Sequence, residues 1–60
     1  MKTKAGDIFR SLLNGSLYIV KKIANRMVVL ESQDGRSQIL TEIDILESKI
    51  FYQKEEEAKS

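Results

Sequence analysis

The sequence predicts an all-β fold, a small and tightly curled barrel of about five strands in a single domain. Segments rich in β-branched and aromatic residues lie at 17–23 and 27–32, with turn-forming residues between them. An Asp-Gly pair at 34–35 stands between two apolar segments, which is the strongest short-range signal of a β-hairpin. Apolar residues occupy both alternating positions of 27–30, so we expect a curled sheet with both faces partly covered.

The composition agrees with one small folded domain. The chain has 60 residues, of which 42% are hydrophobic, and this is enough for a single small core. It contains no Cys, so disulfides and thiolate metal sites are excluded. It also shows no signal-peptide segment and no apolar run of membrane-spanning length. We therefore expect a soluble, cytoplasmic protein that makes no use of a membrane.

The first half of the domain is predicted to begin with a strand and continue into a hairpin. Asp7–Arg10 has two interpretations, a short strand or the start of a helix capped by Asp7 that ends before Gly15. We favour the strand. Leu17–Ile23 and Met27–Ser32 are then the two strands of a hairpin, with Asn25 able to take the positive φ of the turn between them.

Arg36–Thr41 is predicted to add the third strand of a meander, through a second hairpin closed by Asp34-Gly35. A two-residue loop would place Leu30 opposite Ile39, whereas a three-residue loop with Gly35 in a bulge would place Leu30 opposite Gln38. The sequence is compatible with either loop length, and both loops place Gly35 in the left-handed region.

The C-terminal part is predicted to close the barrel. Thr41 and Asp44 form a possible capping pair for one helical turn that reaches Leu46, and Lys49–Lys54 is then the last strand. The alternative is one long helix from Glu42 to Ala58, which would make a meander packed against a C-terminal helix. The domain is expected to cover residues 1–54 and to leave 55–60 as a charged, frayed tail. The residues expected to be buried are Val20, Val28, Leu30, Ile39, Leu46 and Phe51.

The order of these short patterns resembles that of the SH3-like small barrels of short bacterial proteins. The resemblance spans residues 5–54 and consists of Gly6-Asp7-Ile8-Phe9, Asn14-Gly15 before Leu17-Tyr18-Ile19-Val20, Val28-Val29-Leu30-Glu31, Asp34-Gly35, and a turn near Leu46 before Phe51. It implies a meander, one helical turn and a last strand that returns beside the first. It also implies a binding module, although two Tyr, two Phe and no Trp do not favour the polyproline-binding mode of that fold.

Charge is distributed unevenly along the chain. Residues 1–30 hold six Lys and Arg against one acidic residue, a net charge of +5, and residues 31–60 hold four against eight, a net charge of −4. The candidate binding surface consists of Tyr18, Lys21, Lys22 and Arg26, whose cations could contact phosphates while the ring stacks on a base. The alternative is a solvated edge with Tyr18 in the core.

Catalysis is not expected from this sequence. His and Cys are both absent, and no phosphate-binding loop or nucleophile motif is present. Glu42, Asp44 and Glu47 do not have the spacing of a calcium loop, so we expect no metal and no cofactor. Two classes of function are left, a module that binds another protein or itself and a barrel that binds nucleic acid. The acidic second half favours the first.

Overall fold

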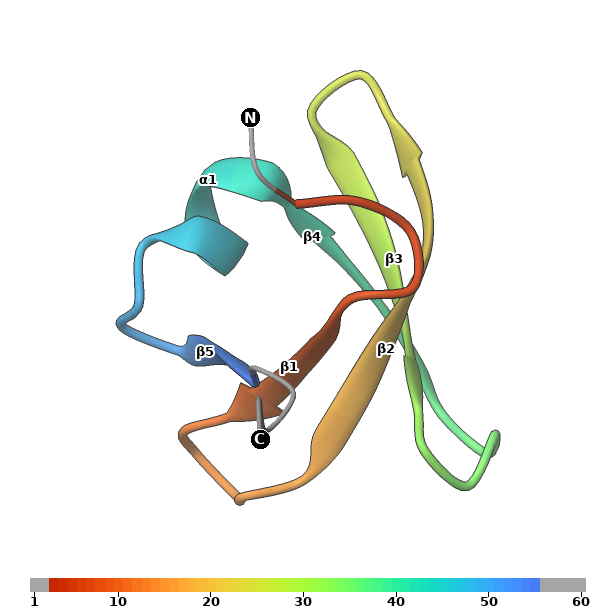
Figure 1. Cartoon of the computed structure of the whole chain (residues 1–60), viewed down its shortest axis with the longest axis vertical. Coiled ribbons are helices and arrows are strands. Elements are labelled where there is room, and N and C mark those ends of the chain that lie inside the picture. The colour runs from red at the N-terminus through yellow and green to blue at the C-terminus, as the bar shows by residue number, and fades with distance from the viewer. Residues whose placement is uncertain (1–2, 56–60) are drawn as a thin grey trace, which may run out of the picture.

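The computed structural model describes residues 3–55. Within this part the elements are β1 (Ile8–Ser11), β2 (Leu17–Ala24), β3 (Met27–Ser32), β4 (Gln38–Glu42), α1 (Ile43–Glu47) and β5 (Tyr52–Glu55). The strands form one antiparallel sheet in the order β4-β3-β2-β1-β5. The sheet curls into a half-barrel, and α1 connects β4 to β5 across its open side (Figure 1).

This architecture confirms the predicted small barrel. The chain begins with a strand and not with a helix, and β5 returns beside β1, where Ile8 lies opposite Glu55. The alternative helix from Glu42 to Ala58 is wrong, because α1 ends at Glu47. Glu55 belongs to β5 and to the folded part of the chain, while the rest of the expected tail, 56–60, lies outside the described residues.

The core is a single cluster on the concave face of the sheet. Its buried members are Phe9, Tyr18, Val20, Val28, Leu30, Ile43 and Leu46. Ile39 is half-buried at the margin of this cluster, together with Ile23 and Tyr52. The cluster contains four of the predicted core residues, and only Phe51 lies outside it and its margin.

The prediction that Phe51 is buried is wrong, since 44% of this residue is exposed. β5 begins at Tyr52, the residue after Phe51, and Tyr52 pairs with Ser11 on the concave side of the sheet. Successive side chains of a strand point to opposite faces, so an inward Tyr52 turns Phe51 outward. Lys49 has a φ of 67°, which marks the bend that delays β5 relative to the predicted Lys49–Lys54 strand.

A β-bulge at Lys21 shapes the centre of β2. Val20 pairs with Leu30, but Lys22 pairs with Val29, so one extra residue is accommodated between them. Strict alternation from Val20 would have turned Lys22 toward the core. The bulge instead exposes both Lys21 and Lys22 and restores the inward direction at Ile23.

The second hairpin has the register of the shorter predicted loop but a wider turn. Leu30 lies opposite Ile39, as the two-residue loop requires. The Ser32 N–H donates to the Ser37 carbonyl at 2.8 Å, so the turn itself spans residues 33–36. Gly35 has a φ of 77°, as predicted, and Asn25 in the first hairpin has a φ of 57°.

Side-chain hydrogen bonds within this turn hold Asp34. Its carboxylate accepts from the Ser32 hydroxyl at 2.6 Å and from the Arg36 N–H at 3.0 Å. These two bonds lower the pKa of Asp34 below its ordinary value, and the bond from Ser32 has the larger effect. The carboxylate therefore supports the turn above its ordinary pKa, and this support is lost as the pH falls through the lowered value.

Replacing Ser32 by Ala is expected to return the pKa of Asp34 toward its ordinary value, because the larger stabilising bond is removed. A carboxyl-carbon NMR titration measures this pKa directly. Ser37→Ala is the matched control, since only the backbone of Ser37 bonds to Ser32. Equal Asp34 pKa values in the wild type and Ser32→Ala would contradict the prediction.

The predicted capping role of Thr41 is wrong. Thr41 stays in β4 opposite Val28, and Glu42 is the N-cap residue, without a side-chain capping bond. The Ile43 N–H donates to the Arg26 carbonyl at 2.7 Å. The backbone of the β2–β3 turn thus satisfies the first N–H of α1, and no side-chain cap is needed there.

Candidate functional site

The predicted basic surface lies on the convex side of β2 and on the turn that follows it. Lys21 and Lys22 are exposed at the bulge, and Arg26 is exposed in the β2–β3 turn. The structure therefore places the three cations on one hairpin, as their spacing in the sequence suggests.

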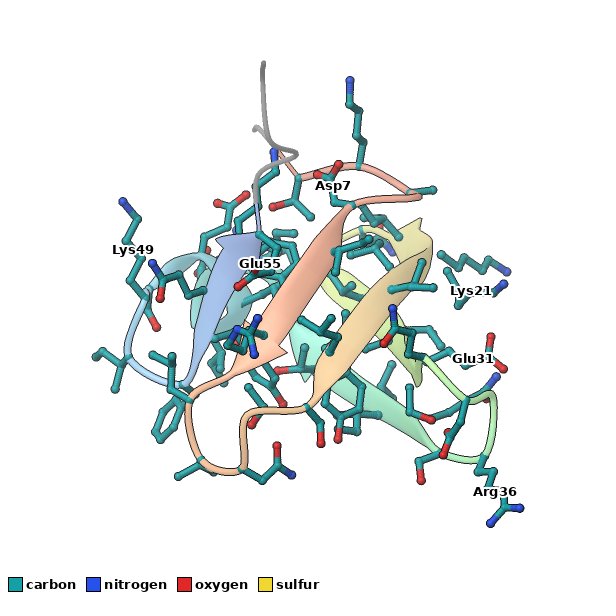
Figure 2. All side chains as sticks on the ribbon, turned by 60° about the horizontal axis from the view of Figure 1, so that its bottom comes forward. Asp7, Lys21, Glu31, Arg36, Lys49 and Glu55 are labelled. Carbon is teal, nitrogen blue, oxygen red and sulfur yellow. The ribbon has the colours of Figure 1, made fainter. Side chains whose placement is uncertain are left out.

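Carboxylates from later parts of the chain meet two of these cations. The Lys21 ammonium lies 3.4 Å from a Glu31 carboxylate oxygen, and Figure 2 shows both residues on neighbouring strands. The Arg26 guanidinium forms an ion pair with Asp44 of α1. Among the described residues of this hairpin, Lys22 is thus the one cation without an ion pair. A phosphate would have to displace carboxylates from the other two.

Tyr18 lies on the opposite side of the sheet from these cations. It is 8% exposed, and its ring meets that of Tyr52 edge-on, with centroids 6.4 Å apart and planes at 89°. The pKa of Tyr52 is raised above its ordinary value, mainly by burial and to a smaller extent by the nearby Tyr18. The structure thus does not bring Tyr18 together with Lys21 and Lys22, and its ring is a core element.

A different surface is exposed where β1 ends and β5 begins. We call it the apolar loop surface, and it consists of Leu12, Leu13, Ile50 and Phe51. The Leu12 N–H donates to the Phe51 carbonyl at 2.8 Å, which extends the β1–β5 ladder by one pair. Leu13 and Ile50 are the next residues along the two chains. Leu13 is 81% exposed and Ile50 is 68% exposed, so the surface is open to solvent.

The local structure explains why Leu12 and Phe51 point outward. Ser11 and Tyr52 face the concave side as opposite residues, so Leu12 and Phe51 face the convex side. Leu13 and Ile50 lie beyond the ends of the strands, in the adjoining turn and bend, where alternation no longer sets their direction. Single exposed apolar residues are common on proteins, but contiguous groups of them mark interaction surfaces. The apolar loop surface is therefore the strongest candidate binding surface in the described chain.

Sequence reasoning missed this surface. Phe51 is predicted to lie in the core, and Leu12 and Leu13 fall between the first two predicted strands. The available signal was the excess of apolar residues around Gly15 and before Tyr52, beyond what the alternation of β1 and β5 can bury.

Two hollows on the surface offer limited room for a small molecule. One, of about 210 Å³, opens between α1 and β5, and its lining includes Phe9, Leu46, Tyr52, Lys49 and Lys54. This volume is below the range of about 300–1,000 Å³ that is typical of small-molecule sites.

The other hollow, of about 390 Å³, is an open depression between the β1–β2 and β3–β4 loops. Its charged groups already have partners, since Arg10 pairs with Glu55 at 2.8 Å and Asp34 binds Ser32. The hydrogen bond from Arg10 is the largest influence on the pKa of Glu55, which it lowers below its ordinary value. The charged groups of this second hollow are thus not free to bind a ligand.

Residues 3–55 contain no group of three or more acidic side chains placed to hold a metal ion. The helix in this range is also too short to cross a membrane. Comparison of the chain with models of known protein families, with curated proteins and with solved structures finds no match. The assignment of a function therefore starts from the surface itself.

Proposed function

We propose that the chain is a small non-catalytic module that binds another protein through the apolar loop surface. The observation that carries this proposal is the joint exposure of Leu12, Leu13, Ile50 and Phe51 at one end of the β1–β5 ladder. Burial of such side chains by a partner releases about 25 cal/mol for each Å² of apolar surface removed from water. Aromatic anchors such as Phe51 commonly contribute a large part of the binding energy.

The rival function, binding of nucleic acid, has less support. Two of the three cations of the predicted basic surface are ion-paired, and Tyr18 is buried. Single-stranded nucleic-acid sites combine exposed aromatic rings with a continuous cationic groove. On this hairpin the ring and the cations lie on opposite faces of the sheet.

The proposal is tested by comparing two variants of the full chain as immobilised bait. Leu13→Lys with Ile50→Lys introduces charge into the apolar loop surface, and both side chains are exposed, so the fold is expected to persist. The matched control replaces Lys21, Lys22 and Arg26 by Ala. We expect a soluble protein partner that the wild type and the control both retain and that the double Lys variant loses.

A fluorescence-anisotropy titration with a short single-stranded oligonucleotide completes the test. We expect no binding stronger than about 100 μM at physiological salt, which is the weak end of non-specific affinity. Micromolar binding that falls steeply with salt and disappears in the triple Ala variant would overturn the proposal and establish the basic surface as the functional one. Unchanged thermal midpoints of both variants show that the fold is intact.

A further inference from the structure

Among residues 3–55, no strand pairs with the outer edge of β4. Natural proteins protect sheet edges with Lys, Pro or bulges. The opposite edge strand, β5, carries Lys54, which lies 3.4 Å from Asp7. β4 is longer, has no Lys or Pro, pairs with β3 without a bulge and leaves Leu40 65% exposed. This edge therefore has the features of a strand that pairs with another chain.

The direction of the free backbone groups follows from the ladder between β3 and β4. The Ile43 N–H bonds to the Arg26 carbonyl at the end of this ladder, and hydrogen-bonded pairs alternate in an antiparallel sheet. The alternation assigns the residues whose N–H and C=O point away from β3. They are Gln38, Leu40 and Glu42.

We propose that β4 pairs antiparallel with β4 of a second copy, with Leu40 on the two-fold axis. In this register all five residues of the strand find an opposite residue. Leu40 meets Leu40 of the second copy, and Gln38 meets Glu42, whose carboxylate can accept from the Gln38 amide. Three outward pairs that each exchange two backbone bonds give about six intermolecular hydrogen bonds.

Charge around the strand favours this antiparallel arrangement. Arg36 precedes β4, has no ion pair among the described residues and points away from the sheet (Figure 2). Glu42 ends β4 and is exposed. The two-fold axis brings Arg36 of each copy diagonally near Glu42 of the other, so two attractive pairs form and no like charges are opposed.

Apolar contacts support the same register. Leu40 lies opposite the half-buried Val29 on the convex face. Joining the two edges makes a strip that runs from Val29 and Leu40 of one copy to the same residues of the other. The most exposed apolar residue of the edge thereby loses part of its contact with water.

Sedimentation velocity of the full chain tests the proposal. We expect the wild type to shift from monomer to dimer as its concentration rises from about 10 μM to 1 mM, in keeping with the small area of a single strand edge. Leu40→Lys places two ammonium groups across the axis and is expected to leave only monomer. Leu13→Lys, on the apolar loop surface, is the matched control and is expected to dimerise like the wild type.

Charge reversal tests the register. Arg36→Glu and Glu42→Arg are each expected to raise the dimer dissociation constant about tenfold, because each opposes like charges across the axis. The double variant restores opposite charges and is expected to recover the wild-type value. No partial recovery in the double variant would overturn the assigned register.

Three outcomes would overturn the dimer itself: a monomeric wild type throughout the range, a dimer that survives Leu40→Lys, or growth beyond two copies through the β5 edge. This proposal is independent of the apolar loop surface. Loss of the dimer in Leu13→Lys would count against β4, whereas loss of partner binding in that variant bears on the proposed function.

Discussion

Replacing Leu46 by Ala is expected to lower the free energy of unfolding by about 3 kcal/mol. Leu46 is 0% exposed and extends from α1 into the open side of the half-barrel, where it completes the core. The adjoining hollow already borders Phe9 and Tyr52, so truncation would enlarge an existing space instead of being filled by its neighbours. A domain of this size has a total stability of only about 3–9 kcal/mol.

Thermal and urea unfolding measure this effect. The thermal midpoint is expected to fall by about 12–24 °C. Ile45→Ala is the matched control, because Ile45 lies beside Leu46 on the same short helix but is 41% exposed. Its cost is expected to be less than about 1 kcal/mol. Similar losses for the two variants would show that α1 contributes through its backbone and not through Leu46.

Replacing Gly35 by Val is expected to destabilise the fold by about 1–3 kcal/mol, because a β-branched residue is forced to positive φ. The φ of Gly35 is 77°, and a Cβ there would approach only a Glu31 carboxylate oxygen, at 3.8 Å. That distance is an ordinary contact. The cost is therefore conformational and does not arise from a steric clash.

The choice of residue at position 35 separates these two causes. Gly35→Asn adds a side chain of similar size, but Asn tolerates the left-handed region, so this variant is expected to lose less stability than Gly35→Val. Urea unfolding of both variants gives the difference. Equal losses would mean that crowding, and not backbone conformation, determines the cost at this position.

The hairpins were predictable because their signals are local. Asn25 and Gly35 both have the positive φ that their residue types suggested, and the strands between them have the expected order. The sequence left two registers for the second hairpin, one of which is the observed Leu30–Ile39 pairing. The two differ by one residue in loop length, and that one residue reverses the face to which every later side chain of the strand points. The same sensitivity explains the exchange of Phe51 for Tyr52 in the packed position.

The candidate surfaces were less predictable because they depend on contacts between distant parts of the chain. Lys21 and Arg26 form a cationic group in the sequence, but their partners, Glu31 and Asp44, lie 10 and 18 residues further on. The bulge at Lys21 could have been inferred from the sequence. Tyr18 and Val20 point inward, and regular alternation would place the charged Lys22 inward as well.

The pairing of β1 with β5 bears on how the chain folds. The two hairpins close over a few residues and can form within microseconds, whereas β5 must reach a strand that begins 44 residues earlier. We therefore expect the β2–β3–β4 hairpins to nucleate folding and β5 to dock last. Until it docks, the free edge of β1 is open to wrong partners. Docking of β5 therefore covers the edge of β1, along which partly folded chains could otherwise pair and aggregate.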